Sequence, residues 1–337
     1  CLVGSEMCIR DRRINWRNDI RMIEIKVLQA HQGDCIWVRC ISEKTVNIVI
    51  DAGTSTFKKG FRNLVKEINN KKERIDLLVF SHIDDDHIKG CIQYLQEKGE
   101  KIIDKVWING SGSRVYSDMQ EHSVNNVSNL VTLIMEKNIP IETPILEGKE
   151  YVFCGGRIKV IGPTKNEMLK VATKIEHSNQ VTEHAGYKYV GNIIDVQDKY
   201  QPDLSDSNKA SIIMVVEFEN KKLLFTGDST SENIIKAVDK YYPGDEFEVV
   251  KLPHHGSPRN ISRELIRRLS TNKFIISTNK ALEKVVLFRF AEERKTTELL
   301  CNYEWWATGY FTEDDIKKYF DTNRIVMRYI GEEKIIL

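Results

Sequence analysis

The sequence predicts an α/β protein of the α+β type, in which two mixed sheets pack together and helices cover their outer faces. Strand patterns come in consecutive groups at the start of each half of the chain, and helical patterns follow each group. No linker or short repeat separates the halves, so we expect one domain over residues 22–337, with 298–337 as an appended αβ element. The 337 residues, 41% of them hydrophobic, are enough to form such a core.

The elements of the first half follow from hydrophobic periodicity. Alternation of Ile23, Ile25 and Val27 indicates a half-buried strand, and IDLLVF at 75–80 is typical of a fully buried one. Apolar residues at three-and-four spacing predict an amphipathic helix over 57–70, with Phe57, Phe61, Leu64, Val65 and Ile68 on its buried face. The complete set is strands at 22–29, 35–40, 46–50, 75–80 and 102–108, helices at 57–70, 88–98 and 123–138, and a hairpin at 150–161.

The second half begins after a long polar segment. Residues 163–210 contain few periodic apolar positions, so we expect an irregular and functional or disordered stretch there. Beyond it, the patterns predict strands at 211–218, 221–226, 247–251 and 273–277, helices at 231–241 and 261–270, a helical stretch to about 297, and a short mixed tail.

Composition and charge exclude several classes of function. Lys plus Arg number 50 and Asp plus Glu 49, so the net charge of +1 gives no global footprint for nucleic acid or an anionic membrane. No apolar run approaches the roughly 18 residues that span a bilayer, and we expect a cytoplasmic protein without a membrane partner. The 7 cysteines form no C-x-x-C pair, which indicates neither a disulfide framework nor a cysteine zinc site.

The opening segment, residues 1–21, carries neither a helical nor a strand period. It resembles the translated adaptor read-through found at the ends of many metagenomic gene models. We therefore treat it as a non-native leader and expect the natural start at Met22, where the first strand pattern begins.

The first chemical motif directly follows the predicted strand at 75–80. It reads Ser81-His82-Ile83-Asp84-Asp85-Asp86-His87-Ile88-Lys89-Gly90. Carboxylates this close repel one another unless a cation neutralises them, and imidazole with carboxylate is the ligand set of zinc, manganese and iron. In a strand-to-helix turn, the residues at 82 and 84 can reach one ion, and those at 86 and 87 a second. A solvated acidic helix N-terminus would account for one Asp, but not for the whole cluster.

Two further motifs place ligand-type side chains at strand ends. Thr226-Gly227-Asp228 delivers a carboxylate beside a glycine that permits close backbone approach. Pro253-His254-His255-Gly256-Ser257 presents two adjacent imidazoles after another strand. Four of the 8 histidines lie in the first motif and in this pair, although the pair alone could be a hydrogen-bonded loop.

In order and spacing, these motifs resemble those of the metallo-β-lactamase fold hydrolases, whose first metal motif is His-x-His-x-Asp-His. The closest likeness is to the hydrolase domain of ComEC-type competence proteins and their free-standing relatives. The shared motifs span roughly residues 22–280 and are Gly33-Asp34, Ile50 to Gly53, Ser-His-x-Asp-x-Asp-His-x-x-Gly, Phe225 to Asp228, and Pro253 to Ser257. The resemblance implies a four-layer αβ/βα sandwich, with two divalent metal ions between the sheets at their strand ends.

The resemblance also implies roles for individual residues. His82 and Asp84 would hold one metal, Asp86 and His87 the other, and Asp228 would bridge them. His254 or His255 would complete the second site, and the sequence does not decide which. Asp51, Asp34 and Asn208 would lie behind the ligands and orient them, as outer carboxylates and amides generally do, although Asp51 could equally belong to an ordinary turn.

This sequence departs from the common pattern at three places. Asn208 stands where a His usually precedes the strand that leads to the bridging Asp, and Asp84 replaces the second His of the first motif. Both changes make the site richer in oxygen, which favours Mn²⁺ without excluding Zn²⁺. A further His expected shortly after Asn279 is absent, and residues 280–286 read KALEKVV instead. His177 and His184 could supply an imidazole, but we expect both at the surface.

The sequence therefore predicts a dinuclear metal-dependent hydrolase. Two cations about 3.5–4 Å apart activate a bridging hydroxide and clamp the attacking and leaving oxygens. Asp86, His254 and His255 would be the catalytic residues, and the resemblance implies a phosphodiester substrate, either nucleic acid or nucleotide. Lys209, Lys251 and Arg259 flank the motifs as candidate phosphate contacts, although such side chains are mostly solvated.

Two other hypotheses remain open at the level of sequence. The same metal pair could hydrolyse a lactone, thioester or lactam, although the form of the motifs weighs against it. Alternatively, the missing His after Asn279 and the paired Trp305-Trp306 are compatible with a catalytically degenerate, metal-stabilised module that binds a protein partner. Burial of the two tryptophans in the core is the simpler expectation for that pair.

Overall fold

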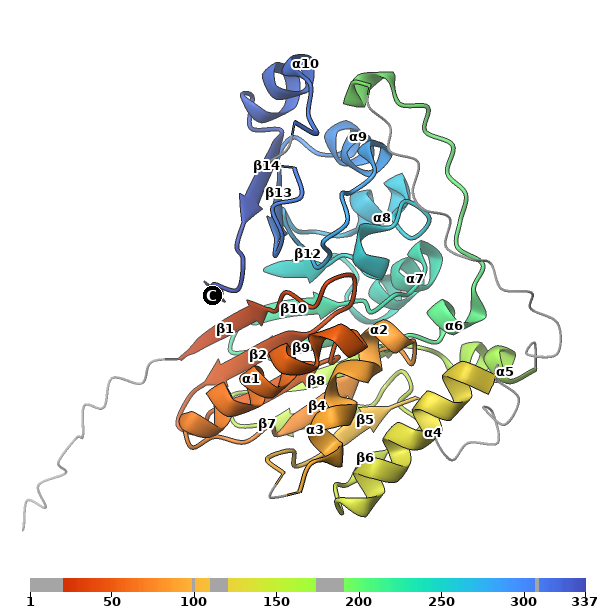
Figure 1. Ribbon diagram of the computed structural model, residues 1–337. Helices are drawn as coiled ribbons and strands as arrows, with labels where there is room; N and C mark the ends of the chain where they lie inside the picture. Colours follow the sequence, from red (N-terminus) through yellow and green to blue (C-terminus); the bar gives the residue numbers. More distant parts are fainter. Residues whose placement is uncertain (1–20, 99–100, 110–120, 174–190, 307–308) are drawn as a thin grey trace, which may run out of the picture.

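The structure, a computed structural model, describes residues 21–98, 101–109, 121–173, 191–306 and 309–337. In these residues two mixed sheets pack face to face, and helices lie on the outer face of each sheet (Figure 1). Among the described helices, none combines the length and apolarity needed to cross a bilayer.

The first sheet has seven strands in the order β15-β1-β2-β3-β4-β5-β6. Its strands β1, β2 and β3 are antiparallel, and β3 to β6 run parallel, so the carboxyl ends of β3 and β4 meet at one edge. The bounds are β1 Met22–Val27, β2 Ile36–Ile41, β3 Val46–Ile50, β4 Leu77–Phe80, β5 Val106–Ile108, β6 Ile141–Glu142 and β15 Lys334–Ile336.

The second sheet has eight strands in the order β14-β13-β12-β11-β10-β9-β8-β7. Strands β10 to β14 are parallel, which brings the ends of β10, β11 and β12 to one edge. The bounds are β7 Glu150–Phe153, β8 Gly156–Gly162, β9 Ile213–Phe218, β10 Lys221–Phe225, β11 Val249–Lys251, β12 Lys273–Ile276, β13 Thr297–Cys301 and β14 Ile325–Tyr329.

Three apolar clusters define four layers. One cluster lies between the sheets and joins Ile25 and Leu77 of the first sheet to Met214 and Leu223 of the second. A second cluster packs the first sheet against α1 (Lys58–Asn70), α3 (Ile92–Gln96) and α4 (Glu121–Glu136). A third packs the second sheet against α7 (Ser231–Tyr241), α8 (Arg263–Arg268) and α9 (Lys284–Glu293). The predicted fold class, two mixed sheets with helices outside, is confirmed.

Most predicted elements are present, with shifts at their ends. In the region of the helix predicted at 57–70, a 3-10 turn, η1 (Ser55–Phe57), leads into α1. Every apolar residue that the sequence assigned to the buried face of this helix is buried. The predicted helix at 88–98 is instead three short pieces: α2 (Asp85–Ile88), η2 (Lys89–Cys91) and α3. Close packing of Gly90 against the loop after β3 accompanies this break.

The expectation of an irregular segment over 163–210 is wrong at its start, where α5 (Lys165–Thr173) forms. The Thr164 hydroxyl accepts from the backbone of Glu167, and the Glu167 carboxylate accepts from the backbone of Thr164. This reciprocal capping box was readable as Thr-x-x-Glu, but the sequence of this segment has few periodic apolar positions. Short turns η4 (Ile193–Asp195) and α6 (Asp206–Lys209) also lie in this segment.

The C-terminal tail contributes to both sheets. Strands β13 and β14 extend the second sheet, and β15 pairs antiparallel with β1 in the first. Between β13 and β14 in the sequence lie α10 (Glu313–Asp315) and a single π-helical turn, η6 (Ile316–Phe320). Trp305 and Trp306 are partly buried and pack against the third apolar cluster, with ring centroids 5.2 Å apart.

Gly90 allows α2 and η2 to lie directly on the loop that follows β3. A Cβ built on Gly90 would lie 1.8 Å from the carbonyl oxygen of Ala52, while the Gly90 amide donates to the Gly53 carbonyl at 2.9 Å. We expect Gly90→Ala to lower the free energy of unfolding by about 3 kcal/mol, because backbone has to move. Urea unfolding checks this, with Gly244→Ala as the control.

Gly244 has a φ of +80° and open space around its Cβ position, so its substitution isolates the cost of backbone conformation alone. That cost is about 1–2 kcal/mol. Equal losses in the two variants would contradict the packing argument for Gly90.

Candidate metal centre

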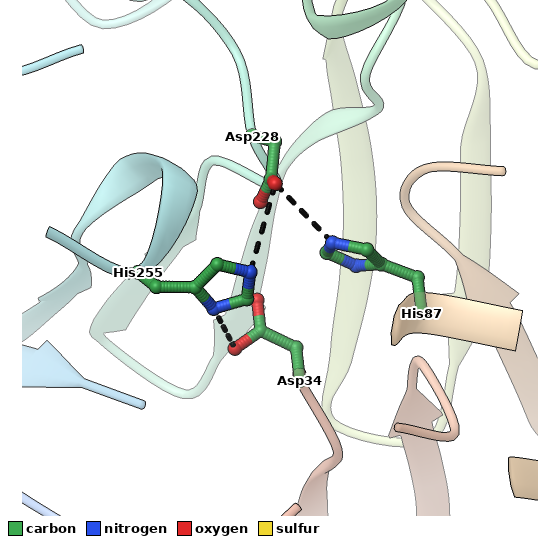
Figure 2. A group of neighbouring side chains, drawn as sticks. All are labelled: Asp34, His87, Asp228 and His255. Atoms are coloured by element: carbon green, nitrogen blue, oxygen red, sulfur yellow. Dashed lines mark hydrogen bonds and ion pairs between the residues drawn. The ribbon is translucent and has the colours of Figure 1, made fainter. Parts of the chain in front are cut away.

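The candidate centre lies at the edge where parallel strands of both sheets end. Asp51 follows β3, the His82 to His87 motif follows β4, and Asp228 follows β10. His254 and His255 follow β11 in the turn η5 (Pro253–Gly256). Because carboxyl ends of neighbouring parallel strands share an edge, residues as far apart in sequence as Asp51 and His255 meet there. Figure 2 shows three of these side chains, His87, Asp228 and His255, together with Asp34 from the loop before β2, turned toward one another.

Three imidazoles surround one buried carboxylate. The Nε2 atoms of His87, His255 and His254 lie 3.2, 3.7 and 3.9 Å from Oδ2 of Asp228, which is 3% exposed. In the part of the chain that the structure describes, Asp34, His87, Asp228 and His255 each offer a ligand-type atom, all within 4.8 Å of one another (Figure 2). This group could hold a metal ion.

The rings of His87 and His255 each have a hydrogen-bond acceptor near Nδ1, the nitrogen that does not face Asp228. The Nδ1 of His87 lies 3.0 Å from a carboxylate oxygen of Asp51. The Nδ1 of His255 lies 3.0 Å from the carbonyl of Ser277, which follows β12. A proton on Nδ1 can be donated to these acceptors, and it leaves the lone pair of Nε2 facing Asp228. Metal-binding histidines are held in this way.

The first motif is arranged in the two expected pairs. His82 Nε2 lies 3.2 Å from Oδ2 of Asp84. Oδ1 of Asp86 lies 3.9 Å from His87 Nε2, and its Oδ2 lies 3.5 Å from His255 Nε2. The side chains of Asp84 and Asp86 are 48% and 28% exposed, whereas both histidines of the motif are buried. The centre is therefore open to solvent on its aspartate side.

Buried polar atoms without a hydrogen bond test whether the centre fits a cation. Among the described residues, His82 Nε2, His255 Nε2, Asp228 Oδ1 and Asp34 Oδ1 are buried and make no hydrogen bond, although an ion-pair partner lies 3.2–3.9 Å from each of them. Buried polar atoms are almost always hydrogen-bonded, so four such atoms around one centre are compatible with a bound cation. Imidazole nitrogen and carboxylate oxygen are the ligands of zinc and manganese, and these residues fit a divalent cation.

The carboxylates and imidazoles of the centre stabilise one another's charged forms. Burial lowers the pKa of His255, but Asp34 and Asp228 outweigh it and raise the pKa to about 9. The pKa of His87 is also raised, because Asp228 and Asp51 outweigh its burial. Burial opposes ionisation of Asp228, yet the neighbouring histidines hold its pKa well below the usual range. Protons therefore occupy the centre in the absence of metal, and a metal has to displace them.

The His-His-Gly turn has a strained backbone. His254 and His255 have φ values of 47° and 54°, in the left-handed region, followed by Gly256 at 93°. A non-glycine residue there costs about 1–3 kcal/mol and usually persists where surrounding structure enforces it. This conformation turns both rings toward Asp228.

Asp34 and Lys251 form a buried pair behind His255. One oxygen of Asp34 lies 3.3 Å from His255 Nδ1, on the side of the ring away from Asp228 (Figure 2). The other oxygen pairs with the ammonium of Lys251, and both side chains are 2% exposed. Lys251 is thus engaged inside the protein, and the expectation that it contacts phosphate is wrong because burial removes it from a substrate.

The other sequence candidates lie around the centre. Asn208 is buried, with its Nδ2 3.3 Å from Nδ1 of His254. The Lys209 ammonium donates to the Leu204 carbonyl at 3.2 Å, and Arg259 is exposed. His177 and His184 lie outside the described residues.

The segment at 280–286, where a His was expected, is built into the fold. Leu282 packs against the position of Gly256 in the His-His-Gly turn. The ammonium of Lys284 lies 2.7 Å from Oδ2 of Asp315, and neither side chain is exposed. The segment at 280–286 therefore contributes apolar packing and a buried ion pair, and it has no imidazole.

Sequence reasoning missed two residues that contact the centre. Asp203 and Asn260 are buried and both approach Nδ1 of His254. Asp203 lies in the segment predicted as irregular, and Asn260 lies in the loop before α8. Neither belongs to a recognisable motif, so no sequence signal marked them.

Sequence comparison with known proteins assigns no family to this chain. No protein-family model and no curated protein sequence matches the chain. The described residues have the strand order and layers given above.

The solved structures that match this chain include the following three proteins. YhfI of Bacillus subtilis, a metallo-β-lactamase fold protein, has 9% identity and a TM-score of 0.39, covering 94% of this chain and 99% of that one. A diphosphatase of the PhnP family has 10% identity and a TM-score of 0.42, covering 94% and 97%. CmlA, a diiron β-hydroxylase of Streptomyces venezuelae, has 11% identity and a TM-score of 0.45. It is matched over 95% of this chain and 54% of its own length, so this chain spans about half of it.

Proposed function

We propose that this protein is a hydrolase that uses two divalent cations, Zn²⁺ or Mn²⁺. The observation that carries the proposal is the convergence of three imidazole Nε2 atoms within 3.9 Å of one buried oxygen of Asp228. The proposed ligands are His82, Asp84, Asp86, His87, Asp228, His254 and His255. The buried atoms of this group that make no hydrogen bond support it, because they are ligand atoms that a cation would bind.

The residues around the ligands would prepare the centre for its cations. When bound, a metal pair lowers the pKa of water and neutralises charge on a reacting oxyanion. Asp51 and the Ser277 carbonyl hold His87 and His255 through Nδ1, so their Nε2 atoms stay directed inward. Asp84 and Asp86 line the open side, where a substrate would enter.

The proposed substrate is a phosphodiester, within a nucleic acid or a nucleotide. Support comes from the carboxylate-rich ligand set, since oxygen ligands favour the hard cations used in phosphoryl chemistry, and from the likeness of the motifs to ComEC-type hydrolase domains. The overall charge of +1 does not oppose a polyanionic substrate, because a local groove can be basic on a neutral protein.

The test compares the full chain with Asp86→Asn and a matched control, Asp85→Asn. Asp85 is the adjacent carboxylate, but it pairs with Lys89 on the helix surface. After reconstitution with Mn²⁺, we expect hydrolysis of bis-p-nitrophenyl phosphate to fall at least about 100-fold in Asp86→Asn, as for loss of a direct ligand, and to remain in Asp85→Asn. Equal rates in the three proteins would refute the proposal. Cleavage of a lactone or thioester alone would retain the metal centre and replace the substrate.

A further inference from the structure

Positive charge is concentrated along α1, which lies on the outer face of the first sheet (Figure 1). Between residues 58 and 74 the sequence has seven Lys or Arg and two Glu, a net charge of +5, whereas the whole chain carries +1. The rest of the chain is therefore acidic on balance, and the positive charge of this segment is local. Such a surface on a nearly neutral protein is a candidate site for a polyanion.

Both glutamates of this segment are used by the sheet beneath the helix. Glu67 pairs with Lys26 of β1 at 2.8 Å, and Glu73 accepts a hydrogen bond from Nε of Arg39 of β2 at 3.0 Å. The acidic side chains of the segment therefore neutralise cations of the strands, and they do not pair with the lysines on the solvent side of α1.

Three exposed lysines of α1 lack a partner: Lys58, Lys59 and Lys66. In the part of the chain that the structure describes, none of their ammonium groups forms an ion pair or a hydrogen bond. Exposed Lys236 and Lys240 of α7, by comparison, each pair with a glutamate, at 2.6 and 2.7 Å. The unneutralised charge is therefore a property of α1, and not of every exposed lysine on a helix.

The exposed residues of α1 form a line along the helix. Spacings of four, three and four residues separate Lys59, Asn63, Lys66 and Asn70, so their side chains lie one above another on the same side. All four are exposed, and side-chain amides donate to phosphate oxygens as ammonium groups do. From Lys58 to Asn70 the helix rises about 18 Å, which matches about five phosphates of one strand of a nucleic acid.

This line begins at the open side of the candidate centre. A Cβ built on Gly33 would lie 2.1 Å from the carbonyl oxygen of Asp86 and 3.2 Å from the amide nitrogen of Thr54, so Asp86 and Thr54 are neighbours. The side chain of Asp86 is 28% exposed on the open side, and Thr54 directly precedes η1, which leads into α1. A strand bound along α1 would therefore have one end at the centre.

The composition of α1 favours nucleic acid over an anionic membrane. The apolar residues of the helix are all buried against the first sheet: Phe61, Leu64, Val65 and Ile68. None is left to insert among lipid chains, as the apolar face of a membrane-surface helix does. The exposed positions offer only hydrogen-bond donors of positive or neutral charge, which suit a phosphate backbone.

We propose that Lys58, Lys59 and Lys66 bind the phosphate backbone of a nucleic-acid strand and lead it along α1 to the candidate centre. The inference deepens the proposed function and rests on it for cleavage of the strand, whereas binding of the strand can be measured without metal. Because these contacts go to phosphates, they hold the strand without reading its bases.

The test measures how tightly the metal-free full chain binds a fluorescein-labelled oligothymidylate of about 20 nucleotides, by fluorescence anisotropy at several NaCl concentrations. The α1 variant combines Lys58→Gln, Lys59→Gln and Lys66→Gln. The matched control removes the same charge from exposed lysines that pair with glutamates elsewhere, and it combines Lys236→Gln, Lys240→Gln and Lys317→Gln. Circular dichroism checks that both variants are folded.

At about 0.1 M NaCl we expect the Kd of the α1 variant to be about 10–100-fold higher than that of the parent. The slope of log Kd against log salt should fall by about 2, because each lost phosphate contact of a single strand removes about 0.7. The Kd of the control should stay within about threefold of the parent, since salt screens charges more than about 10 Å from the strand.

Two results would overturn the inference. One is equal affinity of the α1 variant and the control for the oligonucleotide. The other is a parent protein that does not bind the oligonucleotide but binds phosphatidylserine vesicles through the same lysines, which would assign the surface to a membrane.

The outcomes also separate this inference from the proposed function. If the α1 variant loses the strand but the Mn²⁺-loaded parent cleaves no phosphodiester, the proposed function fails and the binding surface stands. If the loaded parent cleaves bis-p-nitrophenyl phosphate but the α1 variant binds the strand as tightly as the control, the proposed function stands and the inference about α1 fails. If both hold, kcat/KM for the labelled strand should fall in the α1 variant by about the same factor as the affinity.

Discussion

Asp228→Asn is expected to abolish tight binding of two metal equivalents. Oδ2 of Asp228 is the atom on which the three imidazole Nε2 atoms converge, and its Oδ1 has no hydrogen-bond partner. Asparagine keeps the size of the side chain but removes its negative charge and one ligand oxygen. Plasma mass spectrometry of the Mn²⁺-reconstituted full chain should find about two equivalents in the parent and less than one in the variant. Phosphodiester hydrolysis should fall by more than about 100-fold.

The matched control for this variant is Asp245→Asn. Asp245 pairs with Lys222 at 2.7 Å on a partly exposed surface, away from the centre. Its metal content should equal that of the parent, and circular dichroism of both variants should report a folded chain. Two equivalents of tightly bound metal in Asp228→Asn would mean that this carboxylate is not a bridging ligand, and the proposed centre would have to be redrawn.

Lys251→Met is expected to lower the free energy of unfolding of the metal-free protein by about 3–5 kcal/mol, the usual cost of breaking a buried ion pair. Lys251 pairs with Asp34, its ammonium donates to the Gly227 carbonyl at 3.3 Å, and both charged side chains are almost fully buried. Removing the ammonium leaves the buried carboxylate of Asp34 with His255 as its remaining cationic neighbour. Urea unfolding at neutral pH measures the loss.

Two further variants identify the cause of that loss. Lys222→Met breaks the partly exposed pair with Asp245 and should cost less than about 1 kcal/mol. The double variant Lys251→Met with Asp34→Asn should recover part of the stability, because no uncompensated charge remains. If the double variant is less stable than Lys251→Met alone, the cause is lost packing and not an unpaired charge.

The fold class and the location of the centre could be predicted from the sequence. Periodic apolar residues marked α1 and the strands, because a two- or 3.6-residue repeat is a local property of the chain. The motifs around His82, Asp228 and His254 each follow a strand, and parallel strands bring such residues to one edge. Grouped imidazoles and carboxylates then indicated a cation from their chemistry alone.

Other features depended on the tertiary structure. Lys251 reads as an ordinary flanking lysine, and its burial against Asp34 appears only when residues more than 200 positions apart are placed together. Asp203 lies in a segment without periodicity, yet its contacts with Asn208 and Asn260 complete the surroundings of His254. Strand β15 joins the first sheet by pairing with β1, at the opposite end of the chain.

The sequence by itself determined which local segments become strands and helices and which side chains can bind a cation, since both follow from neighbouring residues and side-chain chemistry. The tertiary structure decided which nitrogen of each histidine faces the centre, which charges are paired, and which side chains are open to solvent. These properties depend on distances of a few Å between segments remote in sequence, and hydrogen bonds and ion pairs form only when packing of the two sheets has set those distances.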